Sequence, residues 1–307
     1  MRKDVNKKSN NKSKVVSALA MLLVSAVALS SASYAWFTMS KQVKVNGIEL
    51  TATAPDNILI ATNTSHSDIA DYASTKTLKA DSNKNDVLVG GTATAINADT
   101  LLYPASSLNG INDKIFQTED IEDAGAAKAK ATFSTATNDA NKNKVFYVDV
   151  PLFILTTGSE PVYVAINQKE SEITNGSTNG QNIYKAVKFA VLNADESKNI
   201  GGTYESNDAA EVFANPVIAA GTLPATGIIA DSDSVIKLGT DNATIDDDNK
   251  IRLEGSLDGG PVDGKYTPTE VTVRIWIEGQ SQACVTANAN QNFKFNLVFD
   301  AVTAPAN

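Results

Sequence analysis

The segments EVTVRIWI, residues 270–277, and NFKFNLVF, residues 292–299, decide the fold. In each segment apolar residues recur at every second position, which is the period of a β-strand with one face against a core. The first strand would bury Val271, Val273, Ile275 and Ile277, opposite Glu270, Thr272, Arg274 and Trp276. The second would bury Phe293, Phe295, Leu297 and Phe299. We therefore expect two long strands, each with one face to bury, near the C-terminus.

Similar strand patterns recur along most of the chain. They occupy residues 36–45, 48–54, 57–61, 87–89, 145–155, 162–166, 184–192, 217–219 and 234–238. Asn- and Asp-rich polar segments, predicted as long loops, fill residues 62–86, 134–144, 167–182, 195–208 and 239–264. Short surface helices are expected only within residues 68–78 and 119–131. The sequence thus predicts an all-β protein, an antiparallel two-sheet sandwich of jelly-roll type.

Two local signals refine this prediction. Asn46-Gly47 is a favoured two-residue turn and predicts a hairpin between residues 36–45 and 48–54. Pro151 interrupts residues 145–155 and indicates a bulge or an edge position, because proline cannot donate a ladder hydrogen bond.

Residues 1–35 have the pattern of a secretory signal peptide. Basic residues precede fifteen uncharged residues, 15–29, and small residues precede an expected cleavage between Ala35 and Trp36. If the apolar stretch continues through Phe37 it is long enough to span a bilayer, so a retained anchor is the alternative. We expect three parts: the signal peptide 1–35, an N-terminal strand region 36–54, and one β domain, 55–307.

Charge and composition narrow the function. The whole chain of 307 residues has a net charge of −9, and removal of residues 1–35 leaves 20 Lys and Arg against 34 Asp and Glu, a net charge of −14. Such a surface repels nucleic acid and anionic lipid. We expect a secreted, extracellular or cell-surface protein that contacts the membrane only through its leader and signal peptidase only during export.

The sequence contains few residues of the types that usually carry catalysis. The only histidine, His66, lies in a polar segment and cannot form a two-histidine zinc site by itself. The only cysteine, Cys284, follows a strand and lacks neighbouring cations that would activate a thiol, although an odd cysteine can join two subunits. Asp246 and Asp248 are weak calcium candidates in an acidic run. We predict no enzyme activity, no catalytic residue and no cofactor.

Both ends of the chain resemble a family. The basic leader and the junction Ser33-Tyr34-Ala35-Trp36-Phe37-Thr38, followed by residues 43–50, are similar to TasA/camelysin-type exported surface proteins of Gram-positive bacteria. Residues 273–279, with Cys284 and residues 293–299, resemble the C-terminal part of related surface proteins of anaerobic Firmicutes. The resemblance implies a jelly-roll subunit that polymerises into extracellular matrix fibres of the biofilm type by lending its N-terminal strand to a neighbour.

The favoured function is therefore a structural subunit that self-associates into a homopolymer by donor-strand exchange. A new terminus at Trp36 would start directly with an apolar, alternating strand, which must find a sheet edge. The expected assembly strand carries Trp36, Phe37, Met39, Val43 and Val45. The alternative is a monomeric surface adhesin or carbohydrate-binding β-sandwich, with its site on the long loops or at Trp276.

Overall fold

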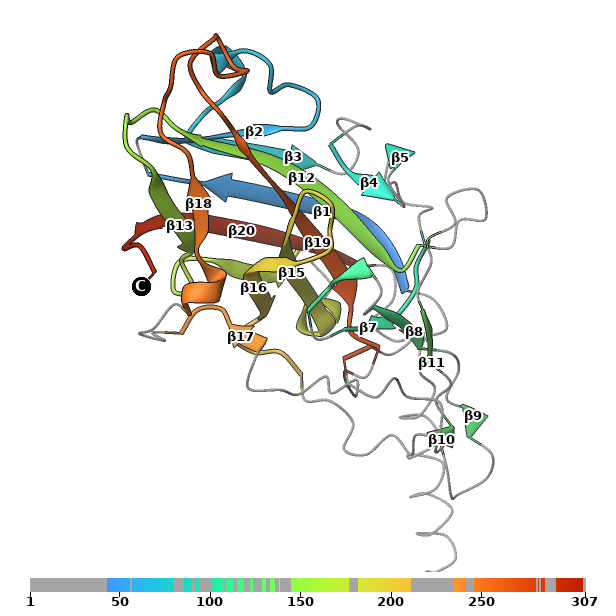
Figure 1. The fold of residues 1–307 in the computed structure, drawn as a ribbon. Helices are drawn as coiled ribbons and strands as arrows, with labels where there is room; N and C mark the ends of the chain where they lie inside the picture. Colours follow the sequence, from blue (N-terminus) through green and yellow to red (C-terminus); the bar gives the residue numbers. More distant parts are fainter. Residues whose placement is uncertain are drawn as a thin grey trace, which may run out of the picture. The chain divides into compact units, whose positions relative to one another are not determined.

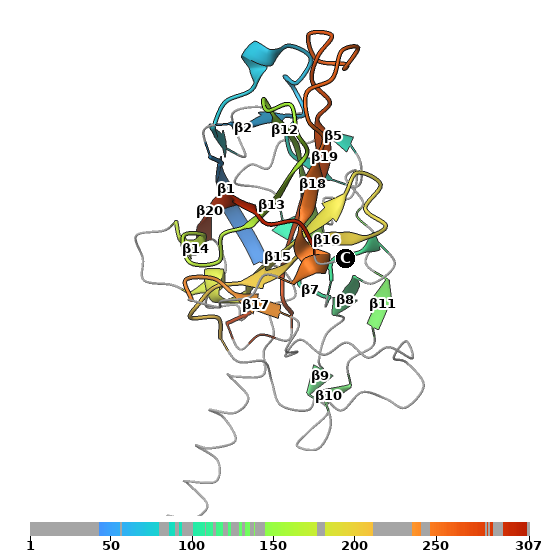
Figure 2. The same ribbon diagram turned by 60° about the vertical axis from the view of Figure 1, so that its left-hand side comes forward.

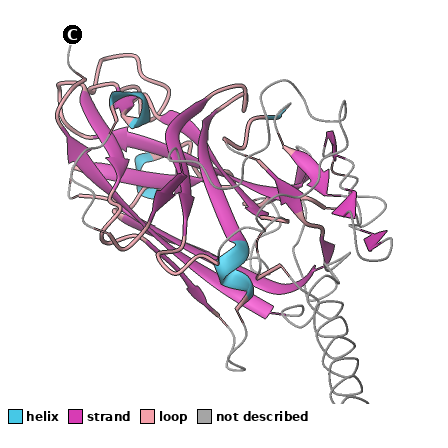
Figure 3. Cartoon of the chain, turned by 90° about the horizontal axis from the view of Figure 1, so that it is seen from below, coloured by secondary structure: helices cyan, strands magenta, loops and turns pink. Residues whose placement is uncertain are grey.

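The computed structural model describes most of the chain from Val43 onward. The described residues are 43–55, 57–79, 86–89, 92–93, 101–107, 109–112, 115–118, 122–123, 129–130, 133–135, 138, 145–176, 182–210, 235–240, 246–279, 281, 283–284 and 291–305. Strands dominate this part, and its helices are single 3-10 turns, η1 (Ile69–Asp71), η4 (Ile183–Ala186) and η5 (Asp247–Asn249) (Figure 3). The predicted all-β class is confirmed.

The first sheet is built around the last strand of the chain. Its order is β18 (Ile251–Leu253), β13 (Val162–Ile166), β20 (Gln291–Val302), β1 (Val43–Thr53) and β3 (Thr75–Lys79). Two further strands join it, β14 (Glu172–Asn175) beside β20 and β6 (Leu101–Leu102) beside the start of β1. The first and last strands run parallel and lie side by side in Figure 1, whereas the other pairs of this sheet are antiparallel.

The second sheet contains most of the middle of the chain. Its order is β17 (Val235–Lys237), β16 (Asn199–Glu205), β15 (Val187–Asn193), β19 (Thr269–Ile277), β12 (Tyr147–Thr156), β4 (Leu88–Val89) and β5 (Thr92–Ala93), with β2 (Ile58–Thr62) also on β12. Only β16 and β17 run parallel here. Smaller ladders join β7 (Ala105–Ser106), β8 (Phe116–Thr118) and β11 (Phe133–Thr135), and β9 (Glu122–Asp123) with β10 (Ala129–Lys130). The sandwich is therefore mixed rather than purely antiparallel, and jelly-roll connectivity stays a prediction.

The main core lies between the two sheets, with β1 and β20 of the first sheet to the left of β19 of the second in Figure 2. The predicted inward residues of β20 are all buried, whereas Lys294 between them is exposed. Phe295 packs edge-on against Phe293 of its own strand and against Phe189 of the second sheet, with ring centroids 5.5 and 5.7 Å apart. The alternation of residues 292–299 thus sets which side of β20 faces the second sheet.

The expectation of a single buried face is wrong for β19. Its core side is buried as predicted, but Arg274 and Trp276 on the opposite side are also fully buried. The reason is an added layer, because Trp276 belongs to a second apolar cluster that includes Ala105 and Ile115, with Ile111 packed against it. Residues from the 101–115 region therefore cover the outer face of β19.

The predicted hairpin at Asn46-Gly47 is also wrong. Strand β1 continues through both residues, and its register against β20 shifts between Val45 and Gly47. Asn-Gly here accommodates a β-bulge, since glycine tolerates the local change of backbone conformation. The main-chain ladder with β20 then continues to Thr53.

Three other local predictions have mixed outcomes. The helix expected within residues 68–78 is present only as the three-residue η1 turn, capped by Asp68, because β3 begins at Thr75. Within the range 119–131 expected as a helix, the described residues Glu122–Asp123 and Ala129–Lys130 pair instead as the strands β9 and β10. Pro151 lies in the interior of the sheet, where the partner of β12 changes from β2 to β4. The change of partner is a place where a missing N–H is tolerated.

Four strands lie inside segments predicted as polar loops. They are β3, β14, β16 and β18. β3, β14 and β18 have five residues or fewer, and the fourth, β16, contains the Gly201-Gly202 pair, so their strand signal is weak.

Substitution of Phe295 by Ala will destabilise the protein by about 3–5 kcal/mol, because it removes a buried ring that contacts both sheets. The same change at the exposed neighbour Lys294 should alter stability by about 0.5 kcal/mol or less. Denaturant unfolding of the two variants measures the difference. Equal effects would contradict the described orientation of β20.

Candidate functional site

The predicted assembly strand is described only in part. Val43 and Val45 lie in β1, whereas Trp36, Phe37, Met39 and the expected cleavage bond between Ala35 and Trp36 lie outside the described residues. Strand β1 occupies an interior position in its sheet, with β20 on one side and β3 on the other. Residues 49–53 are thus held by main-chain ladders along both edges, whereas Val43 and Lys44 pair with β6.

Side chains fix β1 as well as its backbone. Ile48, Leu50 and Ala52 alternate into the main core. On the outer face, the side-chain oxygens of Thr51 and Thr77 lie 3.3 Å apart across the β1–β3 pair, and Lys294 of β20 is 3.6 Å from Glu49. We call the position that β1 occupies between β20 and β3 the β1 slot. A strand in this slot places apolar side chains on the core face and polar side chains on the outer face.

A buried ion-pair network lies on the covered face of β19. Arg274 of β19 donates through Nε and Nη2 to the carboxylate of Asp149, at 2.7 and 2.9 Å. Both residues are buried. The guanidinium also donates to Glu196, to Asn112 at 2.7 Å and to the carbonyl of Gly110 at 2.9 Å. Arg274 therefore joins β12, residues 109–112 and the turn between β15 and β16.

Burial dominates the electrostatics of this network. It raises the pKa of Asp149 to about 6, and the hydrogen bonds and charge of Arg274 act in the opposite direction. This folded-state pKa lies above the ordinary value of 3.8, so the folded protein holds the proton more tightly than the unfolded chain does. The free energy of unfolding therefore falls as the pH rises from 3.8 to about 6. Tyr147 places its ring 4.0 Å from the guanidinium carbon and completes the enclosure. This is a structural network, with its charges directed at one another.

Gly110 makes the covering layer possible. Its φ of +71° lies in the left-handed region, and an added Cβ atom would come within 2.8 Å of Ala190 and 3.3 Å of the Trp276 ring. Only glycine therefore lets the chain approach β15 and β19 closely enough to present its carbonyl to Arg274.

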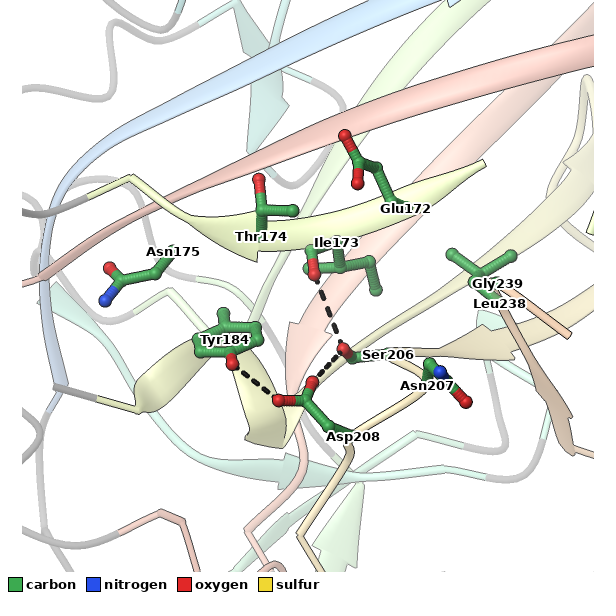
Figure 4. Close-up of a pocket in the computed structure, with 10 residues that line it drawn as sticks. All are labelled: Glu172, Ile173, Thr174, Asn175, Tyr184, Ser206, Asn207, Asp208, Leu238 and Gly239. Carbon is green, nitrogen blue, oxygen red and sulfur yellow. Dashed lines mark hydrogen bonds between the residues drawn. The ribbon is translucent and has the colours of Figure 1, made fainter. Parts of the chain in front are cut away.

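A pocket of about 460 Å³ opens where the two sheets meet at one end (Figure 4). One wall is β14 of the first sheet, and η4 contributes Tyr184. The opposite side is formed by residues 206–208, which follow β16, and residues 238–239, which follow β17. The lining combines carboxylates, amides and hydroxyls with apolar Ile173 and Leu238.

Asp208 is the most firmly held polar group of the pocket. It accepts hydrogen bonds from Tyr184 Oη and from Ser206 Oγ, each at 2.7 Å, as the dashed lines of Figure 4 show, and Lys185 Nζ lies 3.0 Å away. Burial alone would raise the pKa of Asp208, but these hydrogen bonds and the charge of Lys185 outweigh it and lower the pKa to about 2. The carboxylate therefore stays ionised and oriented.

The residues considered for catalysis lie in different parts of the fold. His66 lies in the polar segment that follows β2, but its ring is half-buried and stacks on Phe153 with ring centroids 3.8 Å apart. Cys284 lies fully buried in the main core, where burial first and the charge of Glu278 second raise the pKa of its thiol. A buried neutral thiol cannot act as a nucleophile or join two folded subunits.

The weak calcium candidates lie in the η5 turn. Asp246 caps the turn by accepting from the backbone N–H of Asp248 at 3.3 Å, and both residues are exposed. Within the described ranges, no three His, Cys, Asp or Glu side chains are grouped to hold a metal ion. Trp276 packs in the covered cluster and offers no surface to a sugar.

Comparisons with protein-family models, with curated proteins and with solved structures found no match for this chain. Among the helices of the described part, none has the length and hydrophobicity needed to cross a membrane.

Sequence reasoning missed both the buried network and the pocket. The available signal for the network was a charged residue inside each of two apolar strands, Asp149 and Arg274, since buried charges occur in pairs. The pocket residues offered no comparable signal, because they come from separate polar segments and from the ends of two predicted strands, at Tyr184 and Leu238.

Substitution of Arg274 by Met will destabilise the protein by about 3–5 kcal/mol near neutral pH, because it leaves Asp149 buried without its cation. Loss of the guanidinium raises the pKa of Asp149 further, so the difference from the unsubstituted protein should shrink as acid protonates this group. Denaturant unfolding between pH 5 and pH 8, values chosen to bracket the folded-state pKa of about 6, measures both effects.

The double variant Arg274→Met, Asp149→Asn is the control, since it also removes the stranded carboxylate. It should recover much of the stability lost in the single variant. A single-variant loss that is independent of pH, with no recovery in the double variant, would contradict this account.

Proposed function

We propose that this chain is a secreted structural subunit that assembles into extracellular or cell-surface filaments by exchange of its N-terminal strand. The observation that carries the proposal is the β1 slot, an interior position filled by the first described strand and bordered by the last strand, β20. A neighbouring copy that supplied its own β1 to this slot would make the same main-chain and side-chain contacts.

The energetics favour exchange over an empty slot. Without β1, Leu50 and Ala52 would leave the core, and β20 and β3 would each expose an edge. An exposed apolar edge strand is a template for pairing with another chain. A second copy that supplies its β1 restores these contacts with identical residues. The free-energy difference between the self-paired and exchanged states therefore depends on the hinge and on the entropy of association.

The hinge is the connection between β1 and β2, residues 54–57. In the self-paired state Ala54 N donates to Ser74 O at 2.8 Å, and Ile58 N donates to Pro55 O at 2.9 Å, so main-chain hydrogen bonds hold the described residues on both sides of this short connection. Short hinges of this kind favour strand exchange, because opening them relieves the constraint on the connection. Exchange in one direction between successive copies is a heterologous contact, which yields an open filament when it does not close into a ring.

The sequence supports export of the subunit. The basic and apolar leader with a small-residue junction predicts cleavage before Trp36, which would leave residues 36–42 directly ahead of β1. A terminal donor strand fits strand exchange because no folded segment then has to be threaded past a neighbour.

The variant Thr51→Cys, Thr77→Cys tests whose β1 fills the slot. The two residues are register partners on β1 and β3, and their side-chain oxygens are 3.3 Å apart, so a disulfide between them needs little movement. Oxidation of assembled mature protein should link successive copies and give a ladder on non-reducing gels. Oxidation before assembly should lock β1 in its own subunit and abolish the filaments seen by electron microscopy.

Thr51→Cys alone is the matched control, and it should assemble without a ladder because the native Cys284 is buried. Deletion of residues 36–46 should also abolish filaments. Mature protein that stays monomeric at every concentration, and whose double variant forms only an internal disulfide, would refute the proposal.

A further inference from the structure

The pocket between β14, η4 and the ends of β16 and β17 has the size and lining of a small-ligand site. Its volume of about 460 Å³ falls in the range of roughly 300–1,000 Å³ that is usual for such sites. It is separate from the β1 slot, since β14 pairs with β20 on the edge opposite β1.

The charged residues that line the pocket indicate which charge its ligand can carry. The two charged lining residues, Glu172 and Asp208, are both acidic, and the nearby Lys185 is already paired with Asp208 at 3.0 Å. A phosphate or carboxylate ligand would therefore meet net negative charge without a free cation in the described lining. The ligand must be neutral or cationic.

Hydrogen-bonding capacity narrows the choice. Primary amides of Asn175 and Asn207 line the pocket, and an amide both donates and accepts, as does the hydroxyl of Thr174. The Tyr184 hydroxyl donates to Asp208 and can still accept. A ligand with several hydroxyl groups matches such a lining, since each hydroxyl also donates and accepts. A simple ammonium ion would use only the acceptors.

Apolar surface and preorganisation complete the match. The ring of Tyr184 supplies apolar area, which suits the C–H face of a sugar ring, whereas Ile173 and Leu238 are buried in the main core and expose little surface. Asp208 is already oriented by Tyr184 and Ser206, so its ordering does not have to occur on binding.

We infer that this pocket binds a saccharide unit, with Asp208 and the neighbouring amides contacting its hydroxyls and the Tyr184 ring contacting its apolar face. The site would let the chain hold glycans whether or not it is assembled, because none of the pocket residues belongs to the β1 slot.

Titration of the mature protein with glucose, galactose, mannose and N-acetylglucosamine, followed by saturation-transfer NMR and calorimetry, tests the inference. At least one of these sugars should bind. Asp208→Asn and Tyr184→Phe should each weaken its binding about tenfold or more, because a charged acceptor, or the hydroxyl that orients it, is lost.

Asp195→Asn is the matched control. Asp195 is also an exposed carboxylate that accepts from the serine two residues away, at 2.6 Å from Ser197 Oγ, but it lies outside the pocket. Its substitution should leave sugar affinity unchanged. The inference is overturned if none of the sugars binds, if Asp208→Asn binds them as well as the unsubstituted protein, or if choline and lysine bind in their place. Filament formation is measured separately, so failure of this inference leaves the strand-exchange test intact.

Discussion

The parallel pairing of β1 with β20 is the constraint on which the first sheet depends. Strand β20 is paired along one edge by β13 and β14 and along the other by β1, so it is the centre of that sheet. No local hairpin makes the β1–β20 contact, because the two strands are separated by nearly the whole described chain. Closing so long a loop costs conformational entropy before the contact stabilises anything. The sheet is therefore complete only when the first and last strands of the chain have met.

This dependence gives β1 its unusual status. It contributes to the main core like any interior strand, through Ile48, Leu50 and Ala52, yet only its C-terminal connection ties it to the rest of the β-sandwich described here. A strand of this kind is specified by register and burial rather than by chain connectivity. The bulge between Val45 and Gly47 adds to that specification, since it fixes where the ladder with β20 can begin. The β1 slot therefore determines which segment fills it, but not which copy of the chain supplies that segment.

The sequence predicted those parts of the fold that rest on a clear two-residue period. Residues 292–299 are a strand as expected, since a single apolar face leaves a strong alternating pattern. Residues 162–166 are also a strand as expected, from a short apolar run. Prediction failed where tertiary contacts override local preference. Asn46-Gly47 became a bulge because a neighbouring strand continues past it, and Arg274 and Trp276 were buried by a layer that comes from residues more than 150 positions earlier. Periodicity identifies a face of a strand, but it carries no information about a second layer above that face.

The buried network and the pocket show two opposite uses of polar residues in this fold. Around Arg274 the polar groups are directed at one another, and Gly110, Asn112, Asp149 and Glu196 together satisfy the guanidinium, so the network fixes the covering layer in place. In the pocket Asp208 is held by groups at one side, Tyr184, Ser206 and Lys185, while the neighbouring Asn207 is exposed. Polar groups enclosed by protein stabilise a structure, whereas oriented polar groups that border a cavity are available to a ligand. The same acidic, Asn-rich composition that made residues 167–182 and 195–208 look like featureless loops is what gives the end of the sandwich its binding chemistry.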